Sequence, residues 1–129
     1  QGITLDSARA DTAGYFILSV PDTGNYQLSL SPVQAWGGIN SFDALRAMQH
    51  FAQMIPPLEG LVFSAADVNA TGIVNATDAL RIQKRFVGLD STFLIPDWLS
   101  QPRVVHLQSD TFLTLKALCA GDVDQSYTP

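Results

Sequence analysis

The twelve residues Asp67-Val-Asn-Ala-Thr-Gly-Ile-Val-Asn-Ala-Thr-Asp78 decide the fold, because their spacing is typical of a metal-binding loop that opens into a helix. Calcium takes six to eight oxygen ligands, and such a loop supplies them from positions 1, 3, 5, 7, 9 and 12. Those positions hold Asp67, Asn69, Thr71, the backbone carbonyl of Ile73, Asn75 and Asp78. Gly72 stands at position 6, where the chain must turn sharply. We therefore predict a calcium loop here; the alternative is a helix cap rich in Asp and Asn.

The unit formed by this loop and the helix after it occurs twice, at a distance of 35 residues. Between residues 37–51 and 72–86, seven of fifteen positions are identical: Gly37, Asn40, Asp43, Ala44, Leu45, Arg46 and Phe51 in the first copy. The first copy lacks a loop entrance, because its positions 1, 3 and 5 would be Pro32, Gln34 and Trp36. The first copy therefore contains only the second half of a calcium loop, which we call its exit, and lacks the first half with positions 1, 3 and 5, which we call its entrance.

The last residues of the chain supply an entrance without an exit. Residues 122–126 repeat the pattern of residues 67–71, and Tyr127 then stands where the glycine is expected. We predict that the two half-loops combine into a second, composite calcium site. Its ligands would be Asp122, Asp124 and Ser126 from the entrance, Asn40 and Asp43 from the exit, and a carbonyl near Thr128. A solvated acidic tail is the alternative interpretation.

The remaining chain changes from strand to helix and back. Alternating apolar residues predict strands over residues 16–20 and 26–30, and again over 104–107 and 113–117 around a turn at Ser109 and Asp110. Residues 37–88 have a helical period. One buried face is predicted at Leu45, Met48, Ala52 and Ile55, with Pro56 ending the helix, and another at Ala79, Ile82 and Phe86, with Gly88 after its end.

We therefore expect an α+β fold: a small Ig-like or prealbumin-like β-sandwich with a helix pair inserted into it. The expected parts are residues 1–31 for the first strands, 32–90 for the calcium-binding helix pair, and 91–129 for the strands that complete the sandwich. The short strands at the start of the chain would not be stable without such a partner sheet.

Composition excludes several classes of protein. Of 129 residues, 47% are hydrophobic and 15% charged, which is too apolar for a disordered chain. The net charge of −5, with scattered basic residues, argues against nucleic-acid binding. No apolar run reaches the roughly 20 residues that cross a bilayer. The single cysteine, Cys119, excludes an internal disulfide and is expected to be buried. The start at Gln1 suggests a mature processed chain or an excised fragment.

The paired loop–helix units of residues 32–90 resemble a dockerin, the calcium-dependent module that docks onto cohesin domains. Residues 65–69, 75–80, 97–99 and 121–124 are similar to C-terminal regions of large surface proteins from Bacteroidetes-type bacteria. Residues 1–30 resemble part of a carboxypeptidase-regulatory or Cna-B-type sandwich. The resemblance implies calcium binding and partner contacts at loop positions 10 and 11. These positions hold Ala76 and Thr77, with Ser41 and Phe42 in the first copy, in place of the usual Ser-Thr pair.

Together these features predict an extracellular, non-catalytic module that is secreted or exposed at the cell surface. It would bind two Ca²⁺ ions and a protein partner, either a cohesin-like domain or copies of itself. The alternative function is a self-assembling subunit or repeat of a bacterial surface filament or adhesin. An enzyme is not expected, because the two histidines, His50 and His106, belong to no catalytic motif.

Overall fold

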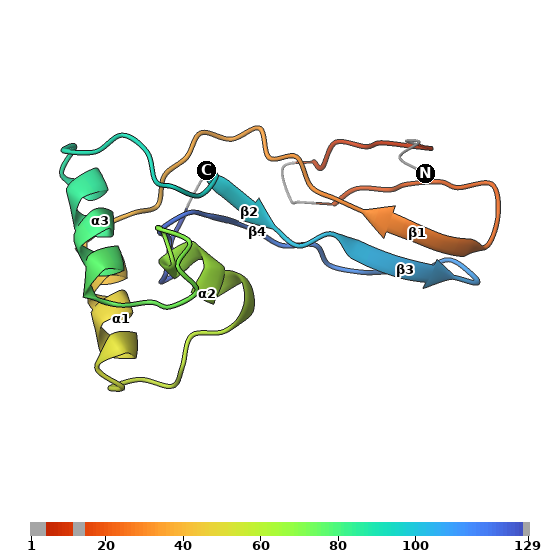
Figure 1. Ribbon diagram of the computed structural model, residues 1–129. Coiled ribbons are helices and arrows are strands. Elements are labelled where there is room, and N and C mark those ends of the chain that lie inside the picture. Colours follow the sequence, from red (N-terminus) through yellow and green to blue (C-terminus); the bar gives the residue numbers. More distant parts are fainter. Residues whose placement is uncertain (1–4, 12–14, 128–129) are drawn as a thin grey trace. The chain divides into compact units, whose positions relative to one another are not determined.

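The computed structural model describes residues 5–11 and 15–127. Within these ranges the chain is a small mixed α/β protein with three helices and two antiparallel sheets of two strands each. The elements, in chain order, are β1 (Gly24–Leu28), α1 (Ser41–Phe51), α2 (Gly60–Ala66), α3 (Ala76–Phe86), β2 (Trp98–Ser100), β3 (Arg103–Leu107) and β4 (Ala117–Cys119) (Figure 1).

These elements form two compact units. The first unit comprises the described residues up to Leu28 together with Arg103–Leu113, and the second comprises Ser29–Pro102 together with the described residues from Thr114 onward. The helices, β2 and β4 belong to the second unit.

The first unit is built on the antiparallel pair β1 and β3, in which Tyr26 lies opposite Val105. The expected pairing of an early with a late segment is thus present. The predicted strand over residues 16–20 is absent, although exposed and half-buried side chains alternate there. A complete sandwich is not seen in the part of the chain that the structure describes, where each sheet has two strands.

Two further strand predictions were wrong. The predicted hairpin between residues 104–107 and 113–117 does not form, because β3 pairs with β1 and residues 113–116 lie outside any strand. The C-terminal strand is β4, and it pairs with β2 in the helical unit, with Trp98 opposite Cys119. Cys119 is fully buried and unpaired, as predicted.

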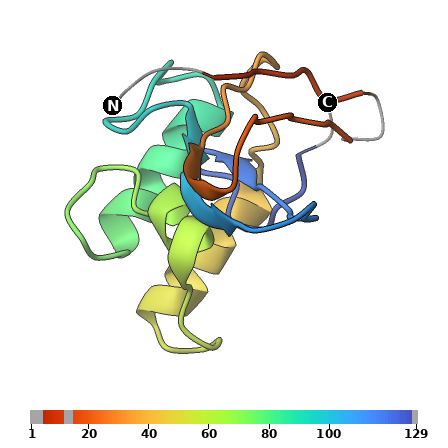
Figure 2. The same ribbon diagram turned by 90° about the vertical axis from the view of Figure 1, so that its right-hand side faces the viewer.

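Helices α1 and α3 pack against each other and are the two copies of the repeat (Figures 1 and 2). Each begins with a capping box: Asn40 caps α1 with Asp43, and Asn75 caps α3 with Asp78. Gly88 follows the C-cap of α3 with a left-handed φ of 85°, as the sequence predicted. Helix α1 ends at Phe51, before Pro56, and α2 was not foreseen.

The core of the second unit is made largely of small side chains. It contains Ala44, Ala47, Leu58, Ala66, Val68, Val74, Ala79, Ile82 and Val123. The predicted core face was wrong at Leu45 and Met48, which are 48% and 39% exposed, and at the exposed Ala52, whereas Ile55, beyond the end of α1, packs against the core. On α3, Ile82 is buried as predicted, but Phe86 is 47% exposed. The buried apolar side chains of α1 and α3 are therefore mostly small, with Ile82 as the exception.

Among the described residues, the helices are too short and too polar to cross a membrane.

Candidate metal centre

The contiguous loop, residues 67–78, joins the end of α2 to the first turn of α3. Asp67 is 7% exposed and Asp78 is fully buried. The Asp67 carboxylate accepts hydrogen bonds from the amides of loop positions 5 and 6, at 3.0 and 2.8 Å. The Asp78 carboxylate accepts from the amides of positions 3 and 9, at 3.4 and 3.0 Å. These bonds fold the loop around the two carboxylates.

Five oxygen atoms of the contiguous loop form a cluster. The side-chain oxygen of Asn69 lies 3.0 Å from Asp67 Oδ1, 3.0 Å from Asp78 Oδ1 and 3.1 Å from Thr71 Oγ1. Thr71 Oγ1 is also 3.2 Å from the carbonyl oxygen of Ile73. The Thr71 hydroxyl is the single donor among them, so most of these close oxygen pairs have no hydrogen between them.

This cluster fits calcium. Ligands about 2.4 Å from one ion lie about 3 Å from their neighbours, and the ion prefers such oxygens. Without an ion, the hydrogen-bond network favours the opposite orientation of the Asn69 amide, in which its nitrogen points inward and donates to Asp67, Thr71 and Asp78. The two orientations make opposite predictions: the first needs a cation, and the second closes the loop with hydrogen bonds alone.

The two half-loops identified in the sequence meet in the second unit. The amide of Asp124 donates to Asp43 Oδ1 at 3.0 Å, and the Ser126 hydroxyl donates to the carbonyl oxygen of Gly38 at 3.1 Å. Asp43, Asp122 and Asp124 each offer a carboxylate oxygen, and the three oxygens lie within 4.8 Å of one another. We call this arrangement, residues 122–127 with 37–43, the composite loop.

The composite loop reproduces the hydrogen bonds of the contiguous loop. Its first carboxylate, Asp122, accepts from the amides of positions 5 and 6 at 2.9 and 3.2 Å. Its last carboxylate, Asp43, accepts from the amides of positions 3 and 9 at 3.0 and 2.7 Å. The residues at position 4, Ala70 and Gln125, have φ angles of 57° and 59°. The two loops therefore share one geometry although only one is continuous.

Sequence reasoning missed the carbonyl oxygen of Gly38. It contacts the position-5 hydroxyl as Ile73 does in the contiguous loop, and the 35-residue repeat that relates the two residues could have found it. Thr128, whose neighbourhood was expected to supply this carbonyl, lies outside the described residues. Tyr127 can occupy position 6, where the contiguous loop has Gly72. The second half of the composite loop belongs to another segment, so the chain need not turn at Tyr127.

Asn40 and Asn75 were predicted as ligands at position 9, and the structure places their side-chain oxygens on helix amides instead. Asn40 Oδ1 accepts from the amide of Phe42 at 2.8 Å, and Asn75 Oδ1 accepts from Thr77 at 2.9 Å. Position 9 of such loops often reaches calcium through water, so this capping role is compatible with a site. Helix capping alone does not explain why residues at positions 1, 3 and 5 converge in both loops.

Burial raises the pKa values of three loop carboxyls. The pKa of Asp43 rises to about 6, mainly through burial, with a contribution from the charge of Asp124. Burial also raises the pKa values of Asp78 and Asp122. For Asp124, burial acts in the same direction, but hydrogen bonds led by that of Ser126 outweigh it and lower the pKa. The loops thus hold carboxylates whose charge is poorly solvated.

No basic side chain in the described part of the chain neutralises these carboxylates. The ion pair found there joins Arg85 to Asp97 at 2.9 Å, with Arg85 also packed on Trp36. Asp43, Asp67, Asp78 and Asp122 are buried without a Lys or Arg partner. Burying an unpaired charge is unfavourable by several kcal/mol, so a bound cation would relieve a defined cost.

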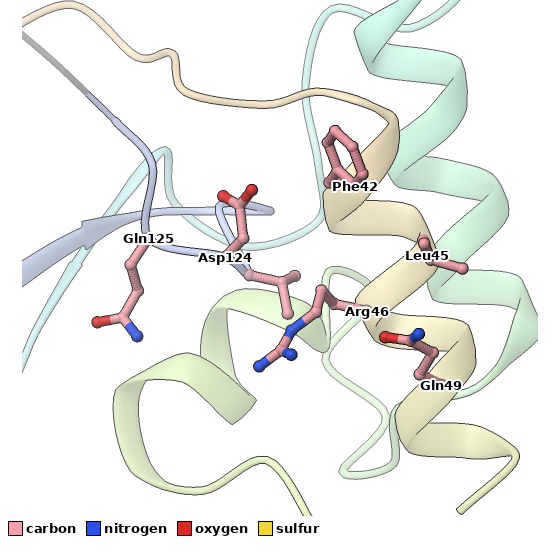
Figure 3. A pocket seen from close by; sticks show the side chains of 7 residues that line it. Phe42, Leu45, Arg46, Gln49, Asp124 and Gln125 are labelled. Carbon is pink, nitrogen blue, oxygen red and sulfur yellow. The ribbon is translucent and has the colours of Figure 1, made fainter. Parts of the chain in front are cut away.

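A hollow of about 510 Å³ adjoins the composite loop. Its walls come from α1, through Phe42, Leu45, Arg46 and Gln49, and from the C-terminal residues Val123, Asp124 and Gln125. Figure 3 shows Arg46 reaching from α1 toward the C-terminal residues.

Comparison of the chain with protein-family models, with curated proteins and with solved structures found no match.

Proposed function

We propose that the chain is a non-catalytic module that binds two Ca²⁺ ions, one in the contiguous loop and one in the composite loop. One observation carries the proposal: two loops of different connectivity fold the same pattern of backbone amides around buried carboxylates that have no basic partner. Two ions would bring the formal net charge from −5 to −1.

The ions would act on the fold rather than on a substrate. Each would neutralise buried carboxylates and tie a loop to the first turn of a helix. An ion at a hundredfold excess over its dissociation constant stabilises the folded state by about 2.7 kcal/mol. Site strength in such loops depends on the number of charged ligands. The contiguous loop has two carboxylates, Asp67 and Asp78, and the composite loop has three, so we expect the composite loop to bind more tightly.

The dockerin-like arrangement of α1 and α3 and the modest charge of the contiguous loop together suit an extracellular setting, where calcium is abundant. In this proposal the ion-ordered helix pair presents a docking surface to a protein partner, such as a cohesin-like domain. A self-assembling surface subunit is the second candidate, because the composite loop joins two segments that any two copies could supply.

Titration calorimetry of chelator-treated protein tests the proposal. We expect two ions per wild-type chain and one ion in each of Asp67→Ala and Asp122→Ala, with Asp110→Ala as an exposed control that keeps both. Circular dichroism of each variant in the presence of calcium would establish that it is folded. Absence of calcium binding by folded wild-type protein would refute the proposal and favour the hydrogen-bonded orientation of Asn69.

A further inference from the structure

Much of the C-terminal segment, Ala117–Tyr127, is buried in the second unit. Residues 118–123 are all buried and form the longest continuous run of buried residues in the part of the chain that the structure describes. Val123 is 1% exposed and belongs to the hydrophobic core. Strand β4, within the segment, pairs with β2. The segment is thus part of the core and not a tail on the surface.

The segment is held by a seat made of residues 34–43, Ala65 and β2. The amide of Gly121 donates to the carbonyl of Ala65 at 2.7 Å. The Trp36 indole donates to the carbonyl of Ala120 at 2.9 Å. The Tyr127 hydroxyl donates to the carbonyl of Ala35 at 2.7 Å. These contacts specify the segment by its backbone and shape, along its whole length.

Two glycines make the fit close. A Cβ atom at Gly38 would lie 2.7 Å from Tyr127 Cβ and 2.8 Å from Tyr127 Cα. A Cβ atom at Gly121 would lie 2.9 Å from a ring carbon of Phe93 and 3.0 Å from the Ile39 side chain. The first glycine belongs to the seat and the second to the segment, so each partner can be impaired separately.

The connection of the segment to its seat is indirect. The chain leaves β3 in the first unit and enters the second unit at Thr114, and residues 108–116 form neither helix nor strand. Within the composite loop, Tyr127 packs against Gly38 without any peptide bond between entrance and exit. The seat therefore recognises the segment through non-covalent contacts, which an identical segment from another chain can make equally well.

We infer that the C-terminal segment exchanges between copies, so that the segment of one chain occupies the seat of a second and the reverse exchange closes a dimer. The tether gives closure within a chain an effective concentration on the order of millimolar, which favours monomers in dilute solution. Reciprocal exchange satisfies both seats and leaves no open end. Calcium in the composite loop would hold either arrangement, and this one aspect rests on the proposed function.

A disulfide across β2 and β4 reports which chain supplies the segment. Ser100 and Ala117 lie opposite each other in this pair, so Ser100→Cys and Ala117→Cys can be combined in full-length protein that also carries Cys119→Ala. We expect calcium addition and oxidation to give disulfide-linked dimers on non-reducing gels after refolding at high concentration, and cross-linked monomers after refolding at low concentration. Ser100→Cys alone is the control for random cross-linking.

Complementation provides a second measurement that does not depend on the disulfide. Gly38→Ala impairs the seat and Gly121→Ala impairs the segment, so neither chain closes well by itself. When the two full-length variants are mixed, the intact segment of the Gly38→Ala chain can occupy the intact seat of the Gly121→Ala chain in a dimer. We expect light scattering and native mass spectrometry to detect the mixed dimer at twice the monomer mass, with neither variant alone forming it.

The outcomes separate this inference from the proposed function. Exchange that is detected in calcium or in chelator would support the inference, while the calorimetry described above decides independently whether the composite loop binds an ion. Two calcium ions bound by chains that remain monomeric in both experiments would overturn the inference and leave the proposed function intact.

Discussion

Replacing Asp43 by Asn should have opposite effects on stability with and without calcium. In protein freed of calcium by a chelator at pH 7.5, Asp43 is a carboxylate fully shielded from solvent. Burial raises its pKa from 3.8 to about 6. The difference corresponds to about 3 kcal/mol of destabilisation when the group is ionised. Because the pKa is raised on folding, this penalty is absent below pH 4 and develops as the pH rises through 6.

Asparagine removes the charge but keeps only one acceptor oxygen. Asp43 accepts amide hydrogens from both Asp124 and Asn40, and losing one acceptor costs about 1–2 kcal/mol. The variant should therefore be about 1–2 kcal/mol more stable than the wild type in chelator. With calcium at a hundredfold excess, the wild type gains about 2.7 kcal/mol from an ion that the variant cannot hold. The variant should then be the less stable protein, by about 1 kcal/mol.

Urea unfolding of both proteins in chelator and in calcium measures the two differences. Asp110→Asn, at an exposed aspartate in the first unit, is the control and should change neither curve. If Asp43→Asn destabilised the protein equally in both conditions, Asp43 would be a helix cap rather than a calcium ligand, and the reasoning would be refuted.

Three further predictions follow from the same structure. Calcium-free wild type should be about 1 kcal/mol more stable at pH 5 than at pH 7.5 in urea unfolding, since the Asp43 pKa is raised to about 6, and saturating calcium should reverse this order. Gly38→Ala should lower the melting temperature more than Gly72→Ala: both glycines have left-handed φ angles, but only a Cβ at Gly38 meets Tyr127. Arg85→Lys should cost about 1–2 kcal/mol by weakening contacts with Trp36 and Asp97, while calorimetry still counts two calcium ions.

The sequence predicted those features that depend on local chemistry. The starts of α1 and α3 and the left-handed Gly88 follow from residue types whose preferences act within a few positions. The meeting of residues 122–126 with the first repeat was also predicted, because an incomplete pattern at each end implied a complementary partner. Whether these residues bind calcium remains a prediction.

Features that depend on tertiary packing could not be predicted in this way. The periodicity of α1 pointed to Leu45 and Met48, but the face of α1 that is buried in the core carries the smaller residues Ala44 and Ala47. Helix α2 begins at Gly60 without a side-chain cap, so it has no local start signal. Strands β2 and β4 have three residues each, which is too short for an alternating pattern to stand out.

The two proposed ions differ in role because the residues that each would join lie at different distances along the sequence. In the contiguous loop, the amide that binds the last carboxylate is nine residues away, whereas in the composite loop it is 81 residues away, from Asp43 to Asp124. Each doubling of loop length costs about 0.6 kcal/mol of closure entropy, so the composite loop requires about 2 kcal/mol more. Two features of the composite loop offset this additional entropy cost: its third carboxylate, which would strengthen ion binding, and the burial of residues 118–123. An ion in the contiguous loop would therefore order a local turn, whereas an ion in the composite loop would hold the two ends of the second unit together.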